Sequence, residues 1–167
     1  MLTLTIAAVA LGLGVPGFER FARDARLTAD VNAFVSAVQL ARGEAAKRGR
    51  SVIVCKTANR VSCAGAEIRY DAGWMVFVND DDRWPPARSA AEPLLLAYVP
   101  VIDGTIDSNR PLYEFRAYRR RSTNGTVTFC DARGPAAARA VIVSYTGRPR
   151  VARLGPAGRA LLCAGLP

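Results

Sequence analysis

The chain has 167 residues, of which 50% are hydrophobic and 22% are charged, a balance that excludes general disorder. This length accommodates one membrane segment and one globular domain of roughly 100–120 residues. The sequence contains no histidine, which excludes histidine-based catalytic triads and histidine pH switches.

The formal net charge of +9 is concentrated in the last third of the chain. Residues 1–109 carry 12 basic and 12 acidic side chains, whereas residues 110–167 carry 11 arginines against only Glu114 and Asp131. This asymmetry favours a polyanionic partner, either nucleic acid or an anionic surface. The alternative is general solubility in an arginine-rich composition.

Residues 1–18 contain no charged side chain. They are nearly long enough to span a ~30 Å hydrocarbon core, which takes about 20 helical residues. A cleaved signal peptide is the alternative, but no basic segment precedes the apolar run and no turn follows it. We therefore predict a retained membrane anchor, in which Pro16 kinks or loosens the helix.

Residues 19–48 predict an amphipathic continuation of the same helix. The apolar residues that recur at spacings of three and four are Leu27, Val31, Phe34, Val38, Ala41 and Ala45. The charged residues that fall largely outside this stripe are Arg23, Asp24, Arg26, Asp30, Glu44 and Lys47, and Gly49 is a plausible stop. A helix over residues 1–48 would be about 70 Å long, so its N-terminal part must be buried in lipid or in other subunits.

After the helix, the pattern changes to short strands separated by turn residues, which predicts one antiparallel β domain. The predicted strands cover residues 51–56, 73–79, 94–99, 112–118, 126–131, 139–145 and 148–154. Asp103-Gly104 is read as a turn, and Asn124-Gly125 predicts a hairpin before residues 126–131. The acidic run at residues 80–82 lacks the spacing of a calcium-binding EF-hand, so a solvated turn is expected there.

The four cysteines are Cys55, Cys63, Cys130 and Cys163. An even number in an exported domain favours two disulfides, and four cysteines allow three pairings. We predict Cys55–Cys63, which closes a short loop, and Cys130–Cys163, which pins the arginine-rich tail to a central strand. Because there is neither a C-x2-C pair nor a histidine, a zinc site is not expected. We expect no other metal and no cofactor.

Several segments together point to a known family. The motif residues at the end of the helix are Leu40, Ala41, Arg42, Glu44, Ala45, Lys47 and Arg48. They are followed by two cysteines, GWMVF at residues 73–77, TVTFCD at residues 126–131 and a terminal cysteine. Over essentially its full length the sequence resembles the FimT/GspH family of type IV minor pilins and type II secretion minor pseudopilins.

This resemblance implies an α+β, pilin-like fold, in which a long N-terminal helix packs on an antiparallel β-sheet domain. Residues 1–18 would be the membrane and assembly part of the helix, residues 19–48 its amphipathic part, and residues 49–167 the head domain. The family relationship further implies single-pass insertion in the bacterial inner membrane with a periplasmic head. After assembly, the subunit would lie at a pilus tip or in a pseudopilus and contact other major and minor pilins through the helix.

Family members begin with a basic leader, a glycine cleavage point, a phenylalanine and an acidic fifth residue, none of which this sequence contains. Aligning Pro16 with the helix proline of the family places about six mature residues and the whole leader before Met1. Processing by prepilin peptidase, N-methylation and the acidic assembly contact are therefore implied by the resemblance but fall on no residue of this sequence.

The principal candidate site is Gly147, Arg148 and Arg150, extended by Arg153. It matches a C-terminal G-R-x-R motif that is associated with DNA binding in FimT-like pilins of competence systems. On an extended segment Arg148 and Arg150 would lie on one face and could contact successive phosphates, for which the planar guanidinium is suited. The alternative is a hairpin turn with solvated arginines.

A second basic cluster comprises Arg116, Arg119, Arg120 and Arg121, either as a supporting phosphate patch or as a solvated loop. Four aromatic residues could stack on bases but are expected in the strand core: Tyr113, Phe115, Tyr118 and Tyr145.

Two functions follow from this reading. The first is a type IV minor pilin that binds extracellular DNA without sequence preference for uptake in natural transformation. The alternative is a GspH-like minor pseudopilin, a structural tip subunit of the type II secretion system. A membrane-anchored enzyme is disfavoured because no nucleophile has a histidine base available, and no catalytic residue is expected.

Overall fold

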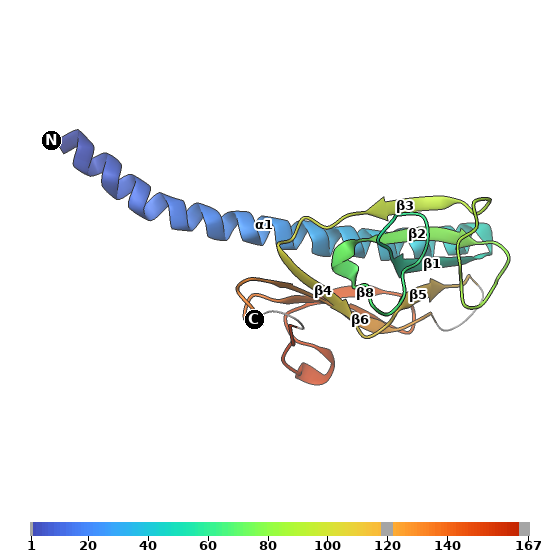
Figure 1. Cartoon of the computed structure of the whole chain (residues 1–167). Helices are drawn as coiled ribbons and strands as arrows, with labels where there is room; N and C mark the ends of the chain where they lie inside the picture. The colour runs from blue at the N-terminus through green and yellow to red at the C-terminus, as the bar shows by residue number, and fades with distance from the viewer. Residues whose placement is uncertain (1, 118–121, 164–167) are drawn as a thin grey trace.

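The computed structural model describes residues 2–117 and 122–163, and of residues 2–16 it describes the backbone alone. Within these residues, one long helix is followed by eight strands that form two antiparallel sheets (Figure 1). This is the α+β, pilin-like architecture that the sequence predicts.

Helix α1 spans Leu2–Arg48 and ends immediately before Gly49, where the sequence predicts its stop. Its C-terminal half packs on the sheets, and the whole predicted stripe from Leu27 to Ala45 is buried. Its N-terminal half protrudes from the head and curves away (Figure 1), with the rings of Phe18 and Phe21 exposed to solvent. In the part of the chain that is described, no helix combines the length and apolar character needed to cross a membrane.

The first sheet has the strand order β3-β2-β1-β5 and the second the order β4-β6-β7-β8. The strands are β1 Ser51–Lys56, β2 Trp74–Asn79, β3 Leu94–Tyr98, β4 Gly104–Ser108, β5 Leu112–Phe115, β6 Gly125–Asp131, β7 Arg139–Val143 and β8 Pro149–Ala152. Two short 3-10 helices, Tyr70–Ala72 and Pro156–Gly158, lie in the connections. Seven of these strands match the predicted ones to within a few residues.

The main core lies between α1 and the inner faces of both sheets. Phe34 of α1 is completely buried, and its ring meets four other rings edge to face at centroid distances of 5.4–6.1 Å. These rings come from four different parts of the head: Tyr70, Trp74, Tyr113 and Phe129. One helical side chain thus joins both sheets to the helix, because β2 and β5 belong to the first sheet and β6 to the second.

Both predicted disulfides are present, and each lies on the outer face of one sheet. Cys55–Cys63 closes a sequence separation of 8 residues over the first sheet, and Cys130–Cys163 closes a separation of 33 residues over the second. Cys130 packs there with Ala138, Ala140 and Leu161, so the C-terminal segment covers the side of the sheet that faces away from α1. The disulfides therefore secure the two faces that the helix does not cover.

Asp30 is a buried carboxylate, although the sequence places it among the charged residues outside the apolar stripe. Its oxygens accept hydrogen bonds from the Tyr98 hydroxyl at 2.8 Å and from the backbone N–H groups of Val101 and Ile102 at 3.0 and 2.7 Å. Burial, together with the hydrogen bond to Asp30, raises the pKa of the Tyr98 hydroxyl to about 12. Asp30 thus ties α1 to the segment that follows β3.

Two turn predictions are wrong. Asp103-Gly104 does not make a simple turn, because Gly104 begins strand β4, which pairs with β6. A side chain at Gly104 would collide with the backbone of Cys130, so the glycine allows the close approach of these two strands. Asn124-Gly125 does not close a hairpin, since β5 pairs with β1 whereas β6 pairs with β4 and β7.

Candidate nucleic-acid interface

The Gly147-Arg148-Pro149-Arg150 segment forms the turn between β7 and β8 and the start of β8. The Gly147 N–H donates to the Ser144 carbonyl at 2.9 Å, and the Ser144 N–H donates to the Arg148 carbonyl at 3.0 Å. Gly147 has φ of +72°, and a Cβ there would lie 3.0 Å from the Ser122 hydroxyl and 3.1 Å from the Phe115 ring. Both the backbone conformation and the tight packing therefore favour glycine at the predicted position.

The strand register directs Arg150 away from the helix. Arg150 pairs with Ile142, whose side chain belongs to the outer cluster, whereas the next pair, Val151 and Val141, alternates to the inner side. Arg148 precedes the first residue of β8, so the face that the sequence predicts for it to share with Arg150 stays a prediction. Both arginines are exposed, and within the described residues neither forms an ion pair.

Arg153, predicted to extend this motif, lies elsewhere. It lines a groove at the opposite end of β8, together with Asp24 of α1, Arg133 and Arg139. Arg153 is therefore separated by the length of β8 from Arg148, and it adds its charge to a different part of the surface. Sequence reasoning did not single out Arg133 and Arg139, because neither belongs to a motif.

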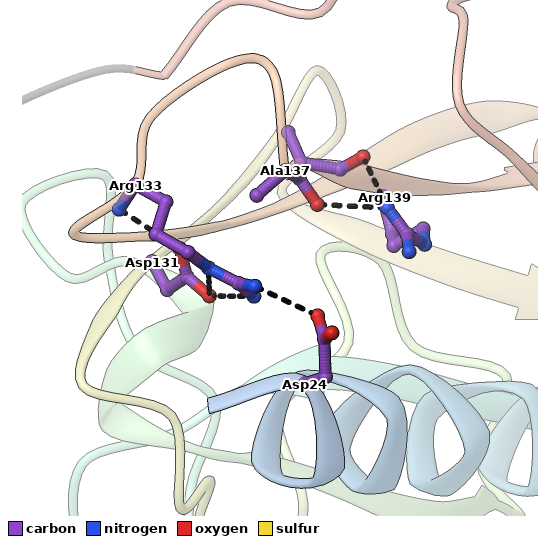
Figure 2. A network of polar contacts seen from close by, with 6 residues as sticks. Asp24, Asp131, Arg133, Ala137 and Arg139 are labelled. Carbon is purple, nitrogen blue, oxygen red and sulfur yellow. Dashed lines mark hydrogen bonds and ion pairs between the residues drawn. The ribbon is translucent and has the colours of Figure 1, made fainter. Parts of the chain in front are cut away.

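In this groove Arg133 is paired with carboxylates, whereas Arg139 and Arg153 form no ion pair with any described residue (Figure 2). The Arg133 guanidinium donates to Asp131 at 2.6 Å and lies 2.9 Å from an Asp24 oxygen, which joins the β6–β7 turn to α1 (Figure 2). Arg139 donates to the carbonyl oxygen of Ala137 at 2.8 Å, so the turn that precedes β7 holds its guanidinium (Figure 2).

The Asp131–Arg133 pair also shifts the pKa values of both groups. Burial alone would raise the pKa of the Asp131 carboxyl, but the hydrogen bonds and positive charge of Arg133 outweigh burial and lower it. The hydrogen bond to Asp131 in turn raises the pKa of Arg133, against the opposing effect of burial. The arrangement favours the ionised form of both side chains.

The second basic cluster is only partly described. Arg116 lies 2.7 Å from Glu114, whose carboxylate also accepts a hydrogen bond from the Ser51 hydroxyl at 2.8 Å. The charge of Arg116 is thus largely compensated. Arg119, Arg120 and Arg121 lie outside the described residues, and the phosphate patch predicted for them stays a prediction.

The aromatic candidates separate clearly by burial. Tyr113 and Phe115 belong to the core, as predicted, and burial raises the pKa of the Tyr113 hydroxyl to about 12. Tyr118 lies outside the described residues. Tyr145, in contrast, is 60% exposed beside Gly147, so the expectation that it belongs to the strand core is wrong. The β7–β8 turn therefore presents an aromatic ring together with its arginines.

A protruding N-terminal helix whose C-terminal half packs on antiparallel sheets defines the pilin class of protein. The profile of the family described as Type II transport protein GspH matches residues 30–147, and the chain belongs to this family. The family comprises structural minor pilins and pseudopilins, which assemble with other pilin-like subunits. The matched region ends at Gly147, so Arg148, Arg150 and Arg153 follow its last residue.

Two crystal structures of the type IV minor pilin FimU from Pseudomonas aeruginosa PAO1 have a similar fold. The form in space group P65 has a TM-score of 0.52 at 16% sequence identity and covers 82% of this chain and 96% of FimU. The P21 form has a TM-score of 0.52 at 17% identity and covers 87% of this chain and 96% of FimU. No curated protein sequence matches this chain.

Proposed function

We propose that this protein is a minor pilin of a type IV pilus that binds extracellular DNA without sequence preference, for uptake in natural transformation. The observation that carries the proposal is the pair Arg148 and Arg150, since Arg150 is exposed on the edge strand β8 and Arg148 is exposed immediately before it. No carboxylate of the described residues neutralises them. Residues two apart on an extended segment have Cα atoms about 7 Å apart, so the guanidinium groups of Arg148 and Arg150 can each contact a phosphate of the DNA backbone.

The family relationship supports the remainder of this proposal. Before assembly, the subunit would be held in the inner membrane by its N-terminal helix, with the head in the periplasm, after processing by prepilin peptidase. In the filament, the exposed rings of Phe18 and Phe21 would pack against other pilin helices. We expect no catalytic activity from such a subunit.

Duplex binding by the full-length chain in detergent tests the DNA site. A labelled duplex of about 30 base pairs is titrated at several salt concentrations, and anisotropy is measured. If each arginine neutralises one phosphate, Arg148→Gln/Arg150→Gln should lower the slope of log K against log salt by about 1.8 and weaken binding at low salt about tenfold or more.

A matched control is Arg60→Gln/Arg83→Gln, which removes two exposed arginines from loops that adjoin the first sheet. Both double variants lower the net charge equally, so the control should retain the wild-type slope to within a few tenths. The proposal is lost if the two double variants bind equally well, or if the wild-type chain does not bind duplex DNA at low salt.

The second candidate function is that of a GspH-like minor pseudopilin in the type II secretion system. It is favoured by the match to the family described as Type II transport protein GspH. Deletion of the chain would then block export of a secreted protein while DNA uptake remained unchanged. The first proposal predicts the opposite result for both measurements.

A further inference from the structure

A groove lies beside the β7–β8 turn, between the C-terminal end of α1 and the end of β5. It has a volume of about 270 Å³, close to the lower limit of roughly 300 Å³ for small-molecule sites. Its lining comes from three parts of the chain, which contribute Arg42 of α1, Arg116 and Ser122 from the segment after β5, and Tyr145 and Thr146 of the β7–β8 turn. No acidic side chain is among these lining residues.

Tyr145 presents its ring beside this groove instead of burying it in the core. The side chain is 60% exposed, while the backbone is fixed because the Tyr145 carbonyl accepts the Ser122 N–H at 2.8 Å. The turn after it is held by the hydrogen bonds of Ser144 and Gly147. A ring on a well-fixed backbone loses little conformational freedom when a flat ligand stacks on it.

Among the described residues, the charge of the groove comes mainly from Arg42. This side chain is exposed on α1, and among the described residues it forms no ion pair. The nearby Glu44 is already paired with Lys47 and Arg48, and Arg116 is paired with Glu114. Arg42 therefore supplies an uncompensated positive charge on one wall, with the hydroxyl groups of Ser122 and Thr146 as neutral polar partners.

We propose that this groove is a subsite for an unpaired nucleobase, with the base stacked on Tyr145 and a neighbouring phosphate bound by Arg42. The inference rests on the proposed DNA-binding function and extends it, because Arg148 lies in the same turn as Tyr145. An aromatic ring beside a basic groove is the combination that binds single-stranded nucleic acid. Bases paired inside a duplex cannot stack in this way, so the subsite selects single-stranded ends and frayed segments.

The test uses the full-length chain in detergent and three labelled DNAs. These are a 12-nucleotide thymidine strand, the same strand with abasic sugars at its central positions, and a duplex whose two strands are joined at each end by a non-nucleotide linker, so that it contains no unpaired base. Tyr145→Ala should weaken binding of the thymidine strand by at least about fivefold and leave the closed duplex unchanged. Tyr145→Phe should retain wild-type affinity, because stacking needs the ring and not the hydroxyl.

The abasic strand separates stacking from charge. The wild-type protein should bind the abasic strand about as weakly as the Tyr145→Ala variant binds the thymidine strand. The Tyr145→Ala substitution should not weaken binding of the abasic strand any further. Arg42→Gln should lower the salt slope for the thymidine strand by about 0.7. The inference is overturned if Tyr145→Ala binds the thymidine strand within twofold of wild type, or if wild type binds abasic and thymidine strands equally.

The pattern of binding to the three DNAs distinguishes a wrong base subsite from a wrong DNA-binding function. If the wild-type chain binds the closed duplex through Arg148 and Arg150 but Tyr145→Ala has no effect on the thymidine strand, only the base subsite is wrong. If the wild-type chain binds none of the three DNAs at low salt, both proposals are wrong. Thermal unfolding of each variant provides the control for folding. Because the Tyr145 side chain is exposed, its substitution should leave the unfolding temperature unchanged.

Discussion

At the residue scale, Asp30 shows how a single buried carboxylate can join elements that are far apart in the chain. It accepts hydrogen bonds from three donor groups, on Tyr98, Val101 and Ile102, which lie about 70 residues further along. The two backbone N–H groups belong to a segment between strands and have no strand partner there. Without the carboxylate, buried polar groups on both sides would lose their partners.

We therefore expect Asp30→Asn to lower the free energy of unfolding by about 1–3 kcal/mol, because an amide offers one acceptor oxygen where the carboxylate offers two. Urea unfolding of the full-length chain in detergent measures this change. Tyr98→Phe is the matched control, because it removes one donor and leaves Asp30 bonded to both N–H groups. It should lower the free energy of unfolding by less than Asp30→Asn does. Equal stability of Asp30→Asn and wild type would contradict this role.

At the element scale, the Arg133 side chain fastens the β6–β7 turn to α1. It bridges Asp131 at the end of β6 and Asp24 on the helix, where the helix leaves the head. Because the folded-state pKa of Asp131 is lowered, this carboxyl stabilises the fold above its unfolded-state pKa of about 3.9. The contribution is lost as the pH falls through the lower folded-state value.

Arg133→Gln should accordingly cost about 2–3 kcal/mol of unfolding free energy near pH 7. The difference from wild type should narrow below about pH 4, as Asp131 becomes protonated in both proteins. Urea unfolding at pH 3, 4, 5 and 7 measures this difference in unfolding free energy between Arg133→Gln and wild type. Arg139→Gln is the control, because Arg139 bonds to backbone carbonyls and its effect should not change over this range. If the unfolding free energy of Arg133→Gln differed from that of wild type by the same amount at every pH, the stabilising role of the Asp131–Arg133 pair would be refuted.

Most strands follow from local sequence patterns, but the pairing of distant elements does not. β4 was missed because its residues GTIDS contain only one large apolar side chain, Ile106, and begin with a typical turn pair. Its formation depends on close approach to β6, which the glycine at residue 104 permits. In the same way, Asn124-Gly125 is a good local turn signal, but the chain passes there from one sheet to the other.

The arginine motif could be located from the sequence, whereas its surroundings could not. A pattern of residues identifies Gly147, Arg148 and Arg150, and alternation along an extended segment predicts a shared face for the two arginines. The sequence does not reveal that Arg42 lies across a groove from Tyr145, since helix and turn are about 100 residues apart in the chain. Nor does it indicate that Arg153 faces Asp24 and Arg139, because that neighbourhood depends on where the helix crosses the second sheet.

At the scale of the whole molecule, the two disulfides should differ in their contribution to stability. The entropy model of loop closure gives about 2.5 kcal/mol for the 8-residue separation and about 3.7 kcal/mol for the 33-residue one. Cys130→Ser/Cys163→Ser should therefore lower the free energy of unfolding by about 1 kcal/mol more than Cys55→Ser/Cys63→Ser. Denaturant unfolding without reductant measures both, and the reverse order would contradict the model.

The Cys130–Cys163 disulfide also has a mechanical consequence. The 33-residue loop that it closes contains the β7–β8 hairpin with Arg148 and Arg150. β8 is an edge strand with one hydrogen-bonded neighbour, so a pull on a bound polymer would peel it from the sheet one residue at a time. The covalent loop ends on β6, which has neighbours on both sides. Tension that detached β8 would therefore pass to the interior of the sheet, and the hairpin would remain tethered to the head.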